Sequence, residues 1–326
     1  MLNAITRRTA LSLVGTAAAS LAARPAAAQN ARTGRAIVGF PAGGTADSVT
    51  RLYVERLRAS GIQMIVDNRP GAGGRIALET LKPLAADGSN LVLTPSGMLT
   101  IYPHLYTRSL RYDPVKDFTP VTPVCKFPFG LAVAARHPAR TLAEFIAWAK
   151  TREAVDWAAP VPGSAPHFMG TELARLAGIT MNHVPYRGSA PAATDLIGGT
   201  LQAVILPLGE LTAFHRGGEA RLLAVTSEAR LPRLPDVPTF AESGFPAITG
   251  EEWYGIFLPA GAPAATVIAL NQALVAAAAT TEIRDALTRI DLTPYTLNPD
   301  DFRTRIAQEL SDWGPIVAAS GFRPDD

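Results

Sequence analysis

Cysteine is almost absent from this sequence of 326 residues, in which Cys125 is the only one. A single thiol cannot form a disulfide within the chain, and it cannot supply a zinc site built from cysteines. Because apolar residues flank the pair Cys125-Lys126, we expect Cys125 to be a buried packing residue rather than a reactive thiol. Stability must therefore come from a packed core.

The sequence also lacks the motifs that identify nucleotide-binding and hydrolytic enzymes. It has no Walker loop, no G-x-S-x-G elbow and no H-E-x-x-H motif. Segment 71–76 approaches a G-x-G-x-x-G loop but has no third glycine. The five histidines never stand at the spacing of metal ligands. We therefore expect no catalytic residue, no metal and no cofactor.

Net charge is small, at +2, and part of it lies in a leader. Residues 1–28 have the order of a bacterial signal peptide, with Arg7 and Arg8 before an apolar run and a small-residue site that ends at Ala28. The paired arginines favour the twin-arginine variant. Cleavage after about Ala28 removes three arginines and no acid, which leaves a net charge of about −1. Neither nucleic acid nor an anionic membrane surface is then an expected partner.

Long apolar runs are missing as well. The run over 10–23 is too short and too rich in alanine for a transmembrane anchor, which is the alternative to a signal peptide. No later run is long enough to cross a membrane. We expect a cleaved, exported chain that is not inserted in the membrane.

From residue 35 onward, short β-rich runs alternate with amphipathic stretches. This alternation predicts an α/β fold with mostly parallel sheets. We predict strands at 36–40, 64–66, 91–94, 131–133, 155–158, 183–186, 201–206, 222–226 and 253–258. Helices are predicted at 47–60, from about 76, from 141, at 167–178, before 198–199, and from 263 and 299.

The order of these runs predicts two lobes. Residues 29–129 plus 250–326 form the first lobe, and residues 130–249 form the second. A chain that leaves one lobe and later returns crosses twice, and two crossing segments make a hinge. Periodicity alone also allows two sequential, independent domains, so this alternative stays open.

Loops rich in glycine and hydroxyl groups follow four of the predicted strands. They cover residues 41–47, 95–97, 163–167 and 186–189. Ligands of open α/β sheets bind beyond the carboxyl ends of the strands, where backbone N–H groups and helix N-termini favour anions. Any one of these loops is better explained by a turn and a helix cap. Together, with the hydroxyls of Thr45, Ser96, Ser164 and Ser189, they predict a cleft for a carboxylate.

Three residues in these loops have two interpretations each. Arg187 follows a strand end beside a glycine, which suits a carboxylate clamp as well as a solvated loop charge. Asp47 stands in the first turn of its predicted helix, where it is most simply a cap or a partner of the helix dipole. His167 fits a helix start near the cleft better than a catalytic base.

Six short motifs follow one another in order after the leader. They are Phe40-Pro41-Ala42-Gly43-Gly44 with Asp47, Asn68-Arg69-Pro70-Gly71-Ala72-Gly73-Gly74, Tyr112-Asp113-Pro114-Val115-Lys116-Asp117-Phe118, His183-Val184-Pro185-Tyr186-Arg187-Gly188, Leu222-Leu223-Ala224-Val225-Thr226 and Leu234-Pro235-Asp236-Val237-Pro238-Thr239. With these motifs the chain resembles the tripartite tricarboxylate transporter substrate-binding proteins, also called the Bug family of periplasmic receptors. The resemblance covers nearly all of the chain after the leader.

The resemblance implies an α/β, two-lobed type II periplasmic binding protein fold, in which mixed or mostly parallel sheets are flanked by helices and joined by two crossing segments. It implies a monomeric periplasmic receptor, not an enzyme, that closes on a small organic acid in the cleft. The implied partner is a membrane permease pair of the tripartite tricarboxylate transporter. The ligand contacts that it implies are Phe40, Gly43, Gly44, Thr45, Asp47, Ser96, Gly97, Ser164, His167 and Arg187.

Two other functions stay open: a secreted hydrolase or lyase that uses Ser164 or His167 in the same cleft, and a ligand sensor that serves a signalling partner. The chain also departs from the family pattern. Ala165-Pro166 stands before the histidine where relatives usually have two hydroxyl residues, and residues 201–208 lack the usual acidic and Phe-Asp/Asn positions. These changes predict a ligand less polar than citrate or aspartate, such as an aromatic or branched monocarboxylate.

Overall fold

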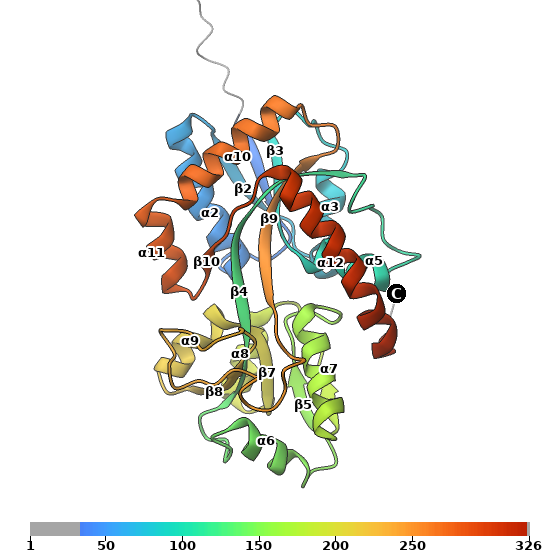
Figure 1. Cartoon of the computed structure of the whole chain (residues 1–326), viewed down its shortest axis with the longest axis vertical. Helices are drawn as coiled ribbons and strands as arrows, with labels where there is room; N and C mark the ends of the chain where they lie inside the picture. Colours follow the sequence, from blue (N-terminus) through green and yellow to red (C-terminus); the bar gives the residue numbers. More distant parts are fainter. Residues whose placement is uncertain (1–32, 325–326) are drawn as a thin grey trace, which may run out of the picture. The chain divides into compact units, whose positions relative to one another are not determined.

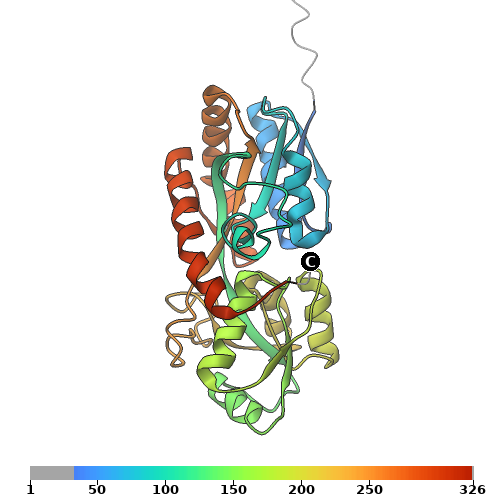
Figure 2. The same ribbon diagram turned by 90° about the vertical axis from the view of Figure 1, so that its right-hand side faces the viewer.

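The computed structural model describes residues 33–324. The predicted signal peptide, residues 1–28, lies outside the described residues, as do residues 29–32 and 325–326. From Gly34 on, the described chain is one compact unit. It contains two lobes, each with strands covered by helices (Figure 1 and Figure 2).

The first lobe is built on strands in the order β2-β1-β3-β9-β4. Strand β1 pairs in parallel with β2 and β3, whereas β9 runs antiparallel to both β3 and β4, so the sheet is mixed. The short strand β10 also pairs with β4. These strands are β1 (Gly34–Val38), β2 (Met64–Asn68), β3 (Asn90–Pro95), β4 (Phe118–Ala134), β9 (Glu251–Pro259) and β10 (Thr293–Pro294).

The second lobe is built on the far half of the long strand β4. There β7 and β8 run antiparallel to β4, and β5 pairs in parallel with β6 and β7. The additional strands are β5 (Val155–Ala158), β6 (Met181–His183), β7 (Ala203–Pro207) and β8 (Ala220–Val225). Strand β4 therefore belongs to both lobes.

Helices cover the strands of each lobe (Figure 1). Those of the first lobe are α2 (Thr45–Leu57), η1 (Arg58–Ser60), η2 (Ala72–Gly74), α3 (Arg75–Leu81), α4 (Gly97–Thr100), α5 (Tyr102–Leu105), α10 (Ala264–Ala278), α11 (Thr281–Arg289) and α12 (Pro299–Ser320). Those of the second are α6 (Leu142–Ala149), α7 (Ala165–Ala177), α8 (Ser189–Gly198) and α9 (Leu208–Arg216). The last helix, α12, contacts α4 and α5 and also reaches α7 of the second lobe.

Several helix ends lie where local chemistry predicted them. Gly61, Gly178 and Gly199 adopt left-handed backbone conformations after η1, α7 and α8. The Thr141 hydroxyl accepts a hydrogen bond from the Glu144 N–H at 3.1 Å and so caps α6. These ends confirm the helix bounds predicted at 60, 141, 178 and 198–199.

Two segments cross between the lobes. Strand β4 pairs with β9 up to Pro128 and with β7 and β8 from Phe129 on. The return segment meets β4 at Thr226, whose buried hydroxyl accepts from the Phe129 N–H at 2.9 Å and donates to the Gly250 carbonyl at 2.7 Å. One side chain thus ties the two crossings together. The residue boundaries of the lobes, 29–129 plus 250–326 and 130–249, stay a prediction.

Large aromatic residues fill both cores. Trp253 packs edge-on against Phe302 with ring centroids 4.9 Å apart, and Trp157 is buried in the second lobe. Trp253 is therefore a core residue of the first lobe. Cys125 is fully buried in β4, as predicted.

Sequence patterns missed the first part of β4, the short strand β10 and the helices α4, α5 and α9, and they did not separate α11 from α10. Residues 118–130, which contain three prolines, were not predicted as strand. Register shifts in the pairing with β9 lie beside Pro120 and Pro123, and such irregularities let a sheet accept proline. Helix α9 has no clear start signal, since its N-cap residue is Pro207. Helix α11 is separate from α10 because the Thr280 hydroxyl caps it.

No single helix in the described part of the chain is both long and apolar enough to cross a membrane. Helices α10 and α11 pass that test only as a pair, by length and composition, and they are bent by 70° at the break between them.

Candidate functional site

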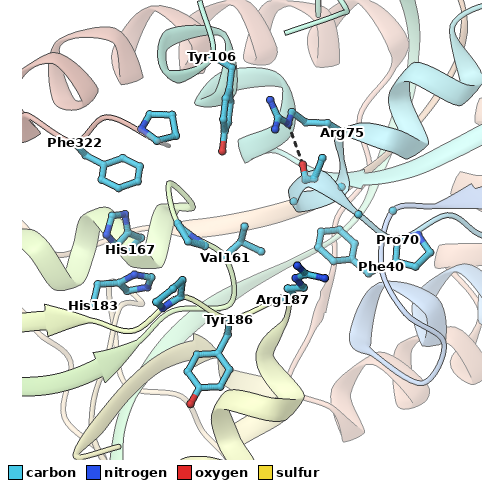
Figure 3. Close-up of a pocket in the computed structure, with 18 of the residues that line it drawn as sticks. Phe40, Pro70, Arg75, Tyr106, Val161, His167, His183, Tyr186, Arg187 and Phe322 are labelled. Atoms are coloured by element: carbon cyan, nitrogen blue, oxygen red, sulfur yellow. Dashed lines mark hydrogen bonds between the residues drawn. The ribbon is translucent and has the colours of Figure 1, made fainter. Parts of the chain in front are cut away.

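A pocket of about 1320 Å³ lies between the two lobes. Its walls come from the loop after β1, the loop and helix start after β2, the segment from β6 to α8, the loop before α7 and the end of the chain (Figure 3). The described residues that line it are Gly39, Phe40, Pro41, Pro70, Gly71, Ala72, Gly73, Gly74, Arg75, Tyr106, Val161, Pro162, His167, His183, Pro185, Tyr186, Arg187, Phe322, Arg323 and Pro324.

Positive charge and apolar surface dominate this pocket. Arg75 opens α3, donates from Nε to the Ala72 carbonyl at 3.0 Å and lies over the Tyr106 ring, 3.8 Å from its centroid. The Arg187 side chain, in the loop after β6, has no hydrogen-bond or ion-pair partner within residues 33–324. Arg323 adds a third guanidinium, and no acidic side chain is found among the described lining residues. The pocket thus offers cations that are not neutralised by the protein.

Two histidines on one wall are held neutral. The His167 Nδ1 accepts from the Gly163 N–H at 3.1 Å, and the His183 Nε2 accepts from the Ala159 N–H at 3.2 Å. Burial, together with the neighbouring His183, lowers the pKa of His167 to about 3, and burial lowers the pKa of His183 to about 4. The centroids of the two imidazole rings lie 4.3 Å apart, and both rings pack against Trp157. They act as a polarisable aromatic wall rather than as cations.

We expect this histidine pair to make the protein less stable in acid. A histidine with a lowered folded pKa stabilises the fold above its unfolded pKa of about 6.5 and loses that stability as pH falls. The free energy of unfolding should therefore drop by about 2 kcal/mol more in the wild type than in His183→Gln between pH 6.5 and 4.5. Glutamine keeps an acceptor for the Ala159 N–H and does not titrate. Chemical denaturation at each pH measures this difference.

Asn182→Gln, a change at the exposed neighbour, is the matched control and should keep the wild-type slope. Equal pH slopes for the wild type and His183→Gln would show that His183 is not held neutral in the fold.

Of the predicted ligand contacts, Phe40, His167 and Arg187 line the pocket, and they come from both lobes. Figure 3 shows the Arg187 guanidinium close to Phe40, across the pocket from Phe322 and the two histidines. The remaining predicted contacts do not line it. Each of the polar side chains among them has a partner within the protein.

Asp47 organises the loop before α2. Its carboxylate accepts from the Gly43 N–H and from Arg51 Nε, both at 2.9 Å, and from Asn68 Nδ2 at 3.0 Å. Burial alone would raise the pKa of Asp47, but these hydrogen bonds outweigh it and lower the pKa. Asp47 is thus a charged cap that fixes Gly43 and, beside it, Gly44, the N-cap residue of α2.

Thr45 and the pair Ser96-Gly97 bind carboxylates that belong to the protein. Thr45 Oγ1 donates to Glu210 Oε1 at 2.8 Å. Ser96 Oγ and Gly97 N donate to Glu252 Oε1 at 3.4 and 3.1 Å. Burial raises the pKa of Glu252 to about 7 against these hydrogen bonds. Burial also raises the pKa of Glu210.

Ser164 does not form a nucleophile–base pair. Its hydroxyl donates to the Val161 carbonyl at 2.6 Å, and the His167 Nδ1 accepts from a backbone N–H instead. No group of three or more His, Cys, Asp or Glu residues in the described chain could hold a metal ion. The geometry suits binding of an anion better than activation of a hydroxyl.

Sequence reasoning missed Arg75, Tyr106, His183 and Phe322 as residues of the pocket. A signal existed for Arg75, because it follows a glycine-rich turn and opens a helix. None existed for Phe322, which lies after the last helix and meets the His167 ring at 4.5 Å between centroids. Its place in the pocket depends on how α12 packs across the lobes.

Comparisons with known proteins agree on one family and one fold. Residues 49–322 match the model of a family described as tripartite tricarboxylate transporter family receptor. Protein BugT of Bordetella pertussis is 33% identical over 294 residues, which cover 89% of this chain and 90% of BugT. The structure of R. palustris Rpa4515 with adipate has a TM-score of 0.85 at 30% identity and covers 90% of this chain and 98% of that one. The periplasmic binding protein BugD has a TM-score of 0.83 at 28% identity, with 90% and 99% covered.

Proposed function

Because this chain belongs to the tripartite tricarboxylate transporter receptor family, we propose that it is a periplasmic receptor that binds a small organic acid in the pocket between its lobes. Its two-lobed α/β fold is that of periplasmic binding proteins, as the resemblance predicted. In this proposal the protein is exported, carries out no chemical step and hands its ligand to a membrane permease pair.

The observation that carries the proposal is the unneutralised positive charge of the pocket. Arg75 and Arg187 come from different lobes and face one cavity that has no acidic lining residue in the described chain. A guanidinium can hold a carboxylate through two parallel hydrogen bonds. A ligand carboxylate would therefore bind most tightly when both lobes contribute a guanidinium to the cavity. The relative solved with adipate supports the same class of ligand.

The pocket walls point to an acid with an apolar body. Phe40, Val161, Tyr186 and Phe322 line the cavity together with the neutral imidazoles. Such walls gain free energy by burying apolar ligand surface, and the few polar groups set the ligand's orientation. This agrees with the predicted preference for a ligand less polar than citrate.

Binding would act through the relative position of the lobes. A ligand that contacts both lobes stabilises whichever arrangement brings its contacts together, so it shifts an open–closed equilibrium. The permease would then recognise the ligand-bound arrangement. Thr226 sits where the two crossing segments meet and is the natural pivot for such a motion.

A thermal-shift screen of the mature protein tests the proposal. The protein is unfolded and refolded to remove carried-over ligand, and then mixed with monocarboxylates, dicarboxylates, tricarboxylates, aromatic acids and amino acids. A ligand at a hundred times its Kd stabilises by about 2.7 kcal/mol, which gives a visible rise in Tm. We expect at least one acid to act and to be recovered unchanged. If no acid raised the Tm, or if the acid that raised it were chemically converted, the proposal would be contradicted.

A further inference from the structure

The carboxylate of Glu210 lies where two helix N-termini meet. Thr45, the first residue of α2, donates to it at 2.8 Å, and the Ser189 hydroxyl, at the start of α8, lies near enough to favour its charged form. Helix α2 belongs to the first lobe, whereas α8 and Glu210 itself, in the first turn of α9, belong to the second. The protein therefore holds one of its own carboxylates between its lobes.

This arrangement has the chemistry of an anion site that is already occupied. Helix N-termini and hydroxyl donors favour a negative charge, and here two of them converge on one acid. The same pattern recurs at Ser96 and Gly97, which bind Glu252. In the described chain, the hydroxyl groups of Thr45 and Ser96, both predicted to receive a ligand carboxylate, are each bonded to an internal one.

The occupied site and the pocket are connected by short stretches of chain. Arg187 lines the pocket and lies two residues before Ser189, and Pro41 lines it four residues before Thr45. A ligand anchored on Arg187 that extends toward the N-termini of α2 and α8 would bring its far end toward Glu210. Two carboxylates in one buried site repel each other, and one of them must then take up a proton or move.

From these contacts we propose that Glu210 sets ligand specificity by occupying the second carboxylate position, so that the receptor binds monocarboxylates and discriminates against dicarboxylates. The proposal rests on the function proposed above. Arg75 and Arg187 hold the single charged end of the ligand, and Glu210 rejects a second one. An apolar or hydroxyl-bearing far end has no such conflict.

Matched pairs of acids in calorimetry test this directly. Hexanoate is compared with adipate, and benzoate with terephthalate; if the thermal-shift screen finds another monocarboxylate, its matched diacid is added. In the wild type we expect the monoacid of the responsive pair to bind at least tenfold more tightly than the diacid. In Glu210→Gln, which removes the charge and keeps the shape and an acceptor for Thr45, the diacid should gain at least tenfold while the monoacid changes less than threefold.

Glu228→Gln, at an exposed acid in the loop after β8, is the matched control and should leave both affinities unchanged. The wild-type ratio of the two acids needs no variant, so the proposal stays testable even if Glu210→Gln folds poorly. A wild type that binds diacids as tightly as monoacids, or a ratio unchanged in a folded Glu210→Gln, would overturn the role of Glu210 alone. A wild type that binds no carboxylate would overturn the proposed function and this inference with it.

Discussion

Arg187→Ala is expected to weaken binding of the carboxylate ligand by roughly 30-fold to more than 1000-fold, which corresponds to about 2–5 kcal/mol. The reason is that the Arg187 guanidinium has no partner in the described protein and faces a cavity without acidic side chains. Arg187 is exposed in the ligand-free structure, and closure of the aromatic and proline walls over a bound carboxylate would desolvate the interaction. Arg187→Lys should recover only part of the loss, because an ammonium keeps the charge but not the two-pronged geometry. Calorimetry with the acid found by screening measures each Kd.

Arg284→Ala is the matched control for this prediction. Arg284 is exposed on α11, outside the pocket, and its loss should leave the Kd unchanged. The Tm of ligand-free Arg187→Ala should also match the wild type, since no hydrogen bond or ion pair in the described chain is broken. If Arg187→Ala bound the ligand within threefold of the wild type, the pocket would be misassigned.

Gly209→Ala is expected to destabilise the protein strongly. A Cβ atom at this position would lie 2.0 Å from the backbone carbonyl oxygen of Ile290. Gly209 is the second residue of α9 in the second lobe, and Ile290 is the C-cap of α11 in the first, so the clash falls on a contact between the lobes. A backbone carbonyl cannot move aside as the tip of a flexible side chain can. Overpacking of this kind lowers the free energy of unfolding by about 1–3 kcal/mol or more. Denaturant titration of the ligand-free protein gives the change in unfolding free energy.

Gly209→Ala should also weaken the contacts between the lobes. Glu210 follows Gly209 directly and reaches Thr45, and Arg233 lies 3.6 Å from Asp291 beside Ile290. Small-angle scattering should therefore show a larger radius of gyration in a folded Gly209→Ala than in the wild type. Gly198→Ala is the control, since a Cβ there meets no atom within 4 Å. Equal stability of the two alanine variants would mean that α9 and the Ile290 turn are not in contact.

Much of this fold could be predicted from local patterns alone. Alternating apolar runs located most of the strands, and Gly61, Gly178 and Gly199 marked helix ends because left-handed backbone favours glycine. The predictions that failed concern contacts between residues far apart in the sequence. The first half of β4 carries three prolines that only its pairing with β9 makes tolerable, and that pairing joins residues more than a hundred positions apart.

The site shows the same division. Glycine and hydroxyl residues after strands were predicted to contact a ligand carboxylate, and Thr45, Ser96 and Gly97 hydrogen-bond instead to carboxylates of the protein. The sequence could not show that the carboxylates are those of Glu210 and Glu252, which lie 165 and 156 positions from Thr45 and Ser96. The local sequence indicates that a carboxylate accepts these hydrogen bonds. Which carboxylate it is depends on how the lobes pack together.

The buried single thiol makes this receptor well suited to distance measurements in solution. Cys125 is fully enclosed, and burial raises its pKa, so it stays a thiol and is shielded from maleimide reagents. Cysteines introduced at exposed positions of opposite lobes, such as Ala143 in α6 and Arg284 in α11, would then carry fluorophores without prior removal of a native cysteine. Energy transfer between the two dyes would test, in single molecules of the otherwise native sequence, whether the lobes open and close as proposed.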